Sequence, residues 1–547
     1  MQNEIKNILN LFNQKQFQKA KAIALNTQNK DNDPQIYLIL GMIQSELNEV
    51  DDAIESIRKS IKIKPINPDA YNNLGTIFNK TKKYDDAILN YKKAIEQKNN
   101  YFQAYFNLGN SLSAKGLKEG AKKNYLKSIE INPEYYEANL NLGIIYHDEY
   151  LYDKAISCFK RAIQLRENSS PAYNNLGNSL LAKGEGAIAI DTYLRGIEID
   201  KNNFKIYSDL GNAYKLTGDH NNAIASIEKS IKLNPNFSEN YSNLANIFND
   251  IGEINKAIEL YKLALKYNPK LTYINYNIAM IFYKLNQLET AIDYFKLSKF
   301  NDHEERILQC QYKLGLFEEF NKGLDKELEK PNTSRLVASL SAHASINLKQ
   351  TNDYDFCKNP LDFILKEEVN DSSLLERLLR KVKENKISHR HQGLLNNGEQ
   401  SSGNIFDHGD SDFTELRDKI FRFSEIYFNL FKDNECEFIR RWPKHKKIRG
   451  WYVNMKQDGF LKPHIHEGGW LSGSLYLSVP KKNKNQTQGN IEFGLHGYDY
   501  PIKKGKFEKK IINILKGDIV MFPSSLFHNT IPFKGEERIC IAFDINP

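Results

Sequence analysis

The sequence predicts a multidomain chain, in which an all-α solenoid of helical repeats precedes a β-rich barrel or sandwich domain with flanking helices. A fixed 34-residue period over residues 34–301, with apolar side chains at helical spacing, indicates the solenoid. From about residue 447 onward the apolar residues alternate along the chain, and this period of two is typical of strands. The length of 547 residues supports at least two domains, because one hydrophobic core rarely serves so long a chain.

Small residues mark the same two places in each repeat. The first series runs through Gly41, Gly75, Gly109, Gly143, Gly177 and Gly211 and continues as Ala245 and Ala279. The second series runs through Ala53, Ala87, Ala121, Ala155, Ala189, Ala223, Ala257 and Ala291. Two antiparallel helices of about 12 to 14 residues with two turns take roughly 34 residues, and the small side chains let these helices lie close together. Prolines such as Pro65, Pro133, Pro235 and Pro269 close several units, because proline cannot continue a helix.

This register resembles the tetratricopeptide repeat (TPR) family. The resemblance implies eight repeats over residues 34–301, a degenerate helical pair before them over 1–33, and degenerate repeats or a cap after them over 302–350. It also implies that the concave surface of the solenoid binds a protein or peptide, either a partner or a substrate. The alternative is that the array only spaces or oligomerises the second domain.

Residues 351–547 are predicted to form the second domain. Two helices, at about 372–385 and 414–431, would cover one face of the strands that follow. The expected strands are separated by turn residues and lie at 450–455, 470–479, 491–493, 511–515, 518–522 and 538–544. Several short strands at this spacing are typical of a sandwich or barrel.

Three histidines and one arginine in this region carry the predicted chemistry. His464 and His466 are two residues apart, so on a strand both imidazoles point to one side and could reach one metal ion. His528 follows another apolar strand, and Arg538 opens the last one. An arginine within an apolar strand is costly unless it meets an anion, and its planar fork suits a carboxylate. A metal site with an arginine nearby suggests a small chelating acid that bridges the two.

This order resembles the 2-oxoglutarate- and Fe(II)-dependent dioxygenases, especially the branch of prolyl 4-hydroxylase-like proteins. The general pattern is HxD or HxE, then a strand with Tyr-Leu, a Gly-Asp turn, a distal histidine and a basic residue about ten further on. In this chain the series reads His464-Ile465-His466, Tyr476-Leu477, Gly517-Asp518, His528 and Arg538. The resemblance implies a double-stranded β-helix, or jelly roll, that uses Fe(II), 2-oxoglutarate as co-substrate and O2.

The resemblance also implies residue roles. His464 and His528 would bind iron, and Arg538 would bind the distal carboxylate of 2-oxoglutarate. Asn454, ten residues before His464, and Tyr476 would help to hold the co-substrate.

The chain departs from the family at one ligand. His466 occupies the position of the carboxylate in the usual two-histidine, one-carboxylate site. Three readings stay open: His464, His466 and His528 together bind the metal, or Glu467 swings in, or the triad is incomplete and the domain inactive. A position three residues from His464 points Glu467 to the wrong side of a strand, which counts against the second reading.

The expected function is hydroxylation of a protein or peptide substrate by an iron oxygenase, with the repeat array binding a partner or the substrate. The alternative is a non-catalytic repeat scaffold whose barrel is a relic or a metal sensor. A third reading is a cupin-like three-histidine enzyme that uses no oxo acid, and Arg538 argues against it.

Composition excludes several other classes. The net charge of +8, from 76 basic and 68 acidic side chains, is diluted over the whole chain, so no nucleic-acid partner is expected. No stretch approaches 18 apolar residues, so no membrane partner is expected either. Five dispersed cysteines without a CxxC motif, and no visible signal peptide, suggest a reducing, cytoplasmic location.

Overall fold

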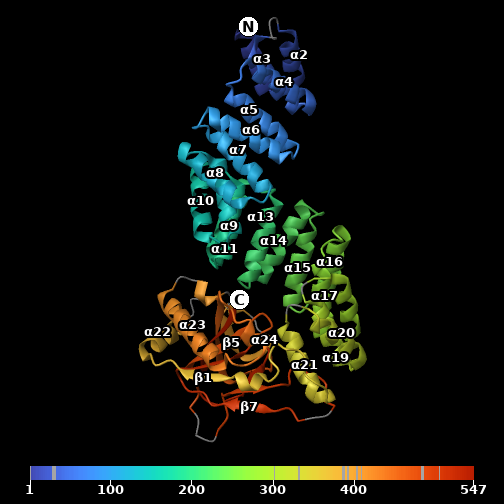
Figure 1. Cartoon of the computed structure of the whole chain (residues 1–547), viewed down its shortest axis with the longest axis vertical. Helices are drawn as coiled ribbons and strands as arrows, with labels where there is room; N and C mark the ends of the chain where they lie inside the picture. Colours follow the sequence, from blue (N-terminus) through green and yellow to red (C-terminus); the bar gives the residue numbers. More distant parts are fainter. Residues whose placement is uncertain are drawn as a thin grey trace. The chain divides into compact units, whose positions relative to one another are not determined.

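The computed structural model divides into two compact units, residues 1–213 and 214–547, which are described separately. The first unit is helical, and the second continues with helices and ends in antiparallel sheets (Figure 1). The predicted order, a helical solenoid followed by a β-sheet domain with flanking helices, is confirmed. The structure describes residues 2–27, 32–300, 302–330, 333–384, 389–390, 393–401, 404–407, 410–481, 486–503 and 506–547.

The first unit consists of paired helices. Its helices are α1 (Gln2–Asn13), α2 (Phe17–Asn26), α3 (Pro34–Glu46), α4 (Val50–Ile63), α5 (Pro68–Lys80), α6 (Tyr84–Gln97), α7 (Phe102–Ala114), α8 (Lys118–Ile131), α9 (Tyr136–Asp148), α10 (Tyr152–Leu165), α11 (Ser170–Ala182), α12 (Gly186–Ile199) and α13 (Phe204–Leu216), the last of which contains the division between units. Side chains of Asp33, Asn67 and Ser169 cap helix N-termini by accepting backbone N–H groups, which satisfies donors that have no partner inside the helix.

The 34-residue period has a simple packing cause. A Cβ added at Gly75 would lie 2.7 Å from the Tyr91 ring, and one at Gly177 would lie 2.4 Å from the Tyr193 ring. The ring therefore occupies the place of the missing side chain, sixteen residues after each glycine. The alanine series is fully buried, as at Ala87. The spacing of glycine, aromatic ring and alanine thus fixes how closely the two helices of a repeat approach.

The second unit begins with helices of the same kind and adds those of the β-domain. They are α14 (His220–Leu233), α15 (Ser238–Asp250), α16 (Ile254–Tyr267), α17 (Tyr273–Lys284), α18 (Leu288–Ser298), α19 (His303–Leu314), α20 (Phe317–Leu328), α21 (Arg335–Leu348), α22 (Ser372–Lys383), α23 (Ser411–Phe431) and α24 (Glu437–Arg440), with 3-10 turns η2 (Pro360–Phe363) and η3 (Ile405–Asp407). No helix of the described residues is long and apolar enough to cross a membrane.

Two antiparallel sheets form the β-domain. The strands are β1 (Leu365–Glu368), β2 (His389–Arg390), β3 (Leu395–Ser401), β4 (Lys447–Leu461), β5 (Leu471–Ser478), β6 (Ile491–Gly494), β7 (Lys509–Ile512), β8 (Asp518–Pro523), β9 (Phe527–Thr530) and β10 (Arg538–Asn546). The large sheet has the order β1-β8-β5-β10-β4-β3-β2, and the small sheet has the order β7-β6-β9. The crossovers in this order agree with the predicted jelly-roll-like arrangement.

Two apolar cores lie on opposite faces of the large sheet. One includes side chains of the small sheet, and we call it the inter-sheet core: Val453, Met455, Tyr476, Ile491, Phe493, Val520, Phe522 and Cys540. The other, the helix-side core, joins strands β5 and β10 to α19, α20 and α21 through Leu471, Leu475, Ile541, Phe543, Leu308, Tyr312, Phe320, Leu336 and Leu340. The domain boundaries predicted from the sequence stay predictions. The helix-side core contains residues from both sides of the predicted boundary at 350/351.

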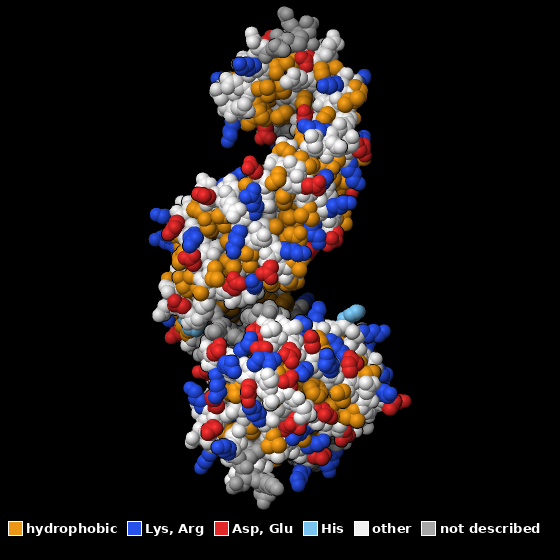
Figure 2. All heavy atoms as spheres, turned by 90° about the vertical axis from the view of Figure 1, so that its left-hand side faces the viewer, with side chains coloured by type: hydrophobic (Ala, Val, Ile, Leu, Met, Phe, Trp, Pro, Cys, Tyr) orange, Lys and Arg blue, Asp and Glu red, His pale blue; other side chains and the backbone are white. Residues whose placement is uncertain are grey.

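The surface carries both signs of charge. On the face shown in Figure 2, lysine and arginine side chains are interspersed with aspartate and glutamate rather than gathered in one basic area. Charged side chains of the solenoid form cross-helix pairs, such as Lys80 with Glu46 at 2.6 Å and Lys118 with Asp148 at 3.1 Å. The positive excess therefore leaves no dense basic patch on this face.

Candidate metal centre

Three histidines converge between the two sheets. His464 lies just after β4, and backbone hydrogen bonds of 3.1 and 3.0 Å pair it with His528 on β9 of the small sheet. His466 follows two residues later, and one nitrogen from each ring lies within 4.8 Å of the others. The ring centroids are 4.3 Å apart for His464 and His528, and 4.9 Å apart for His466 and His528. Donor atoms this close can bind one metal ion.

The second nitrogen of each ring is already engaged, which fixes the tautomer. The Nδ1 atoms of His464 and His528 lie 2.8 and 3.2 Å from the carbonyl oxygens of Lys462 and Leu526. A carbonyl oxygen only accepts, so each Nδ1 carries the hydrogen and each Nε2 keeps a free lone pair. His466 Nδ1 donates likewise, to the carboxylate of Asp544 at 2.5 Å. All three Nε2 atoms are thus left for a metal.

Burial keeps two of these rings neutral. Burial, followed by the neighbouring His466, lowers the pKa of His464 to about 4. Burial, followed by the two other histidines, also lowers the pKa of His528 well below its ordinary value. Both rings are therefore unprotonated at neutral pH, and the neutral imidazole is the form that binds metal.

The carboxylate of Glu467 is engaged elsewhere. It forms an ion pair with Arg306 of α19, with one N–O distance of 3.2 Å, and accepts a hydrogen bond of 3.2 Å from the Tyr498 hydroxyl. Arg335 of α21 donates to the Glu467 carbonyl oxygen at 3.1 Å. Two helices thus hold the residue that follows His466, and the side chain faces them instead of the histidines.

The strand register places Arg538 on the same face of the large sheet as the β10 residue that contacts His466. The residues of β10 on this face, starting nearest His466, are Asp544, Ala542, Cys540 and Arg538. Their neighbours on β5 are Ser472, Ser474 and Tyr476. Ala542 and Ser474 have small side chains. Ser474 is partly exposed, although its strand β5 is an inner strand of the sheet, between β8 and β10. On these two strands, only the small side chains of Ala542 and Ser474 lie between the histidine end of this face and the pair of Cys540 and Tyr476 beside Arg538.

Arg538 is buried at 2% exposure without an acidic partner among the described residues. Its Nε donates to the Gly489 carbonyl at 3.0 Å, and its Nη1 meets only sulfur, with Cys540 Sγ at 3.7 Å. The guanidinium lies over the Tyr476 ring, 4.9 Å from its centroid. The Tyr476 hydroxyl is buried without a hydrogen bond of good geometry, and Ser474 only approaches it. A buried cation and an unsatisfied hydroxyl fit the free carboxylate of a small diacid.

Asn454 is not brought to the other predicted residues by any described contact. It lies on β4 between Val453 and Met455, which both belong to the inter-sheet core, so strand alternation directs it toward the other face. Its Oδ1 is buried without a partner. Its predicted role toward the co-substrate stays a prediction.

No role was predicted for Asp544, although its position in the sequence carries a signal. It stands six residues after Arg538 on the same strand, and an even spacing places both on one face.

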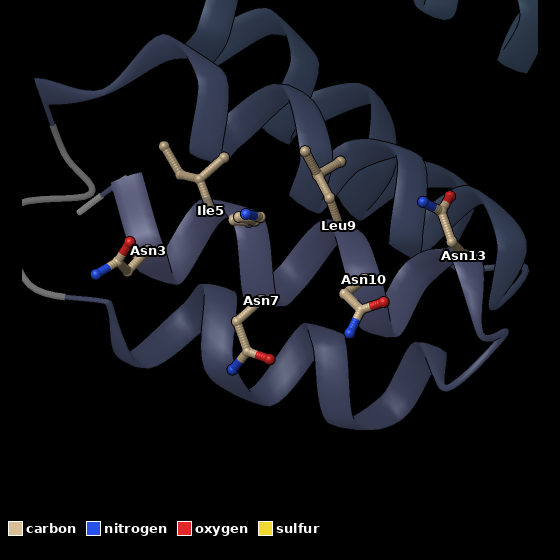
Figure 3. A pocket seen from close by; sticks show the side chains of 7 residues that line it. Asn3, Ile5, Asn7, Leu9, Asn10 and Asn13 are labelled. Atoms are coloured by element: carbon tan, nitrogen blue, oxygen red, sulfur yellow. The ribbon is translucent and has the colours of Figure 1, made fainter.

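A hollow elsewhere, about 750 Å³ along α1, is lined by Asn3, Ile5, Lys6, Asn7, Leu9, Asn10 and Asn13 (Figure 3). Its only titratable lining residue is Lys6, so it offers no comparable chemistry.

Comparison with known families agrees with both parts of the fold. A family described as "Putative 2OG-Fe(II) oxygenase" matches residues 449–544, which include the three histidines, Arg538 and Asp544. Tetratricopeptide repeat families match 34–67, 75–116, 102–135, 136–169, 177–218, 204–237, 238–271 and 272–298. The chain joins TPR repeats to a domain that matches this oxygenase family. The two resemblances predicted from the sequence are thereby confirmed.

Several solved structures resemble part of the chain. A crystal structure of MamA is 31% identical, with a TM-score of 0.28, and its match covers 30% of this chain and 95% of MamA. YrrB, described as a TPR protein with an unusual peptide-binding site, is 22% identical with a TM-score of 0.31 and is matched over 33% of this chain and 94% of its own. A TPR protein from Parabacteroides merdae is 19% identical, with a TM-score of 0.38 and coverage of 46% and 98%. No curated protein matches the chain.

Proposed function

We propose that the chain is an Fe(II)- and 2-oxoglutarate-dependent oxygenase that hydroxylates a protein or peptide substrate. One observation carries this proposal. Three imidazole Nε2 atoms converge at one end of the inter-sheet face, and a buried guanidinium without an anion lies farther along the same face. A 2-oxo acid with a second carboxylate has the two functional groups that such an arrangement would hold.

The protein's own groups would divide the work as follows. His464, His466 and His528 would hold the iron through Nε2, because each Nδ1–H is already donated. Arg538 would bind the far carboxylate of 2-oxoglutarate, with the Tyr476 hydroxyl beside it. The bound iron and co-substrate supply the oxidation of a C–H bond by O2. Phe493 and Phe522, which belong to the inter-sheet core, would keep bulk water from the centre.

The three-histidine ligand set is favoured over the two alternatives. Glu467 would have to leave Arg306 and Tyr498 to reach the metal, which would break an ion pair and a hydrogen bond. An incomplete triad would leave three imidazoles crowded together without a ligand to explain their convergence. Imidazole suits Fe and several other divalent metals, so three such ligands form a plausible centre.

The TPR array would supply the binding surface for a protein partner or substrate. TPR repeats generally bind proteins or peptides, and YrrB is described as having a peptide-binding site. A solenoid of stacked pairs offers an extended concave surface for such a ligand. This part of the proposal defines the substrate class and leaves the modified residue open.

The test combines binding and turnover. Wild type, mixed with Fe(II) and 2-oxoglutarate without oxygen, should show the visible metal-to-ligand absorption band, and with oxygen it should form succinate. His528→Ala should lose both signals, because a ligand is missing. Arg538→Ala should retain iron but bind 2-oxoglutarate at least tenfold more weakly, since a charged hydrogen-bond partner contributes about 1.5–3 kcal/mol. Arg422→Ala, which removes an exposed arginine of α23, is the matched control.

The contrary results are equally clear. Absence of the band and of succinate in wild type would reject the oxygenase. Metal binding without any effect of 2-oxoglutarate would favour the scaffold with a metal-sensing barrel.

A further inference from the structure

The carboxylate of Asp544 contacts the metal centre through one histidine. Its Oδ1 accepts the Nδ1–H of His466 at 2.5 Å and the Ser472 hydroxyl at 2.6 Å. Ser472 and Ser524 share a further hydrogen bond of 2.7 Å. Asp544 is therefore held in one orientation by Ser472 of the neighbouring strand β5 and by His466 of the loop between β4 and β5.

The loop after His466 is packed tightly onto this carboxylate. A Cβ added at Gly469 would lie 2.5 Å from Ser524 Oγ and 3.0 Å from Asp544 Oδ1, so a side chain has no room there. Backbone hydrogen bonds tie His466 N to the Ser524 carbonyl at 2.9 Å and Trp470 N to the Ile545 carbonyl at 2.9 Å. The backbone of His466 is thus fixed to the residue that follows β8, and its side chain to β10.

The three histidines differ in the charge of their partners. His464 and His528 donate to neutral backbone carbonyls, whereas His466 donates to an anion. His466 is also the residue that occupies the carboxylate position of the family pattern. A carboxylate that accepts from a metal-bound imidazole makes that ring a stronger ligand and fixes its orientation.

We propose that Asp544 is a positioning residue of the metal centre. Through His466 it supplies the negative charge that a directly bound carboxylate provides in related sites. The carboxylate of the usual triad is thus replaced by one that contacts a histidine ligand instead of the metal itself. This inference rests on the proposed metal site, and it goes beyond it by assigning a residue outside the ligand set.

Metal affinity without co-substrate is the direct test. Co(II) or Fe(II) is titrated anaerobically into wild type, Asp544→Asn and the control Ser478→Ala, which lies at the other end of β5, with circular dichroism as the check on folding. Asp544→Asn should bind metal about 10- to 100-fold more weakly, which is the usual effect of removing such an outer partner. It should also shift the visible Co(II) spectrum, which a purely structural role would leave unchanged. An unchanged affinity and spectrum would overturn the role of Asp544 and leave the proposed oxygenase standing.

A charge-swap experiment covers the case in which Asp544→Asn folds poorly. His466→Asp places a second carboxylate against Asp544, and their repulsion should weaken metal binding. The double variant His466→Asp/Asp544→Asn removes that repulsion and should bind at least tenfold more tightly than His466→Asp alone. Equal affinity of the single and double variants would contradict the proposal. Failure of wild type itself to bind metal would overturn both this inference and the proposed function.

Discussion

Gly177 illustrates how one absent side chain sets the geometry of a repeat. A Cβ there would lie 2.4 Å from Tyr193, which is buried and donates from its hydroxyl to Asn178 at 2.5 Å. Gly177→Ala should therefore lower the free energy of unfolding by about 1–3 kcal/mol, the usual effect of overpacking. Circular dichroism during urea unfolding measures the loss. Gly120→Ala, whose added Cβ would meet Leu112 at 3.3 Å, is the milder control, and equal effects of the two would contradict this explanation.

Single residues also show what sequence reasoning can reach. His464, His466, His528 and Arg538 were found because local spacing and an apolar strand context mark them. The engagement of Asp544 and Glu467 depends on partners 78 and 161 residues away, and no local pattern encodes such pairs. The face of the sheet that Asn454 takes is not encoded locally either. Its spacing from His464 is in the sequence, but the face it takes depends on the strand register with β10.

At the scale of elements, α19 and α21 hold the loop that contains His466. Arg306 of α19 pairs with Glu467 and with Asp302, the latter at 2.9 Å, and its side chain is 11% exposed. Arg306→Met should lower the free energy of unfolding by about 1–3 kcal/mol, because two carboxylates lose a charged partner. Tryptophan fluorescence during urea unfolding reports on this unit, since all three tryptophans lie in it.

The controls for Arg306 follow from exposure. Arg417→Ala breaks an ion pair with Asp418. The two side chains are 37% and 56% exposed, respectively, so this change should alter the free energy of unfolding by less than about 0.5 kcal/mol. Arg306→Met combined with Glu467→Gln should recover part of the loss. A double variant as unstable as the sum of the two single variants would show that the pair is not coupled.

Helix α21 carries a buried histidine with a pH consequence. His343 is fully buried, and its two nitrogens contact the Tyr312 hydroxyl at 2.7 Å and His496 Nδ1 at 2.9 Å. Burial, followed by His496, lowers the pKa of His343 to about 3. The pKa of this histidine in the unfolded chain is about 6.5. Below that pH the unfolded chain binds a proton at His343, whereas the folded chain does not. The stabilisation is complete above that pH and is lost as pH falls toward 3.

The expected result is a steeper acid response in wild type than in His343→Gln. Between pH 7 and pH 5 the wild type should lose about 2 kcal/mol more than the variant, as the two pKa values imply. Urea unfolding followed by tryptophan fluorescence at both pH values measures this difference. Parallel pH profiles would show that His343 is protonated equally in the folded and unfolded states.

The elements themselves were predicted unevenly, for physical reasons. The helix predicted at 414–431 is α23 (Ser411–Phe431), because its apolar stripe is strong. Strand β3 (Leu395–Ser401) was missed because its sequence, LNNGEQS, is polar. It lies next to the edge strand β2, where few residues are buried, so apolar and polar residues do not alternate. Strand β9 (Phe527–Thr530), which carries His528, was absent from the predicted strands because four residues are too few to show a period.

At the scale of the whole molecule, the helical part and the β-domain share one core in the second unit. The helix-side core contains Leu308 and Tyr312 of α19 and Leu336 of α21 together with Leu475 and Phe543 of the large sheet. Each buried side chain of this size contributes about 1.5–3 kcal/mol. Because a domain is stable by only about 5–15 kcal/mol, losing several of these contacts removes most of the stability.

This shared core predicts how the chain can be shortened. A fragment of residues 272–547 retains α17 to α21 and should unfold cooperatively by tryptophan fluorescence and bind Co(II) as the full chain does. A fragment of residues 351–547 keeps the three histidines of the proposed metal site but loses the helices that carry Arg306 and Arg335, along with the buried side chains that these helices add to the helix-side core. It should bind a hydrophobic dye, show no cooperative transition and bind Co(II) weakly. If 351–547 unfolds with the same midpoint as 272–547, the last helices are only a spacer, and the boundary at 350/351 is a true domain boundary.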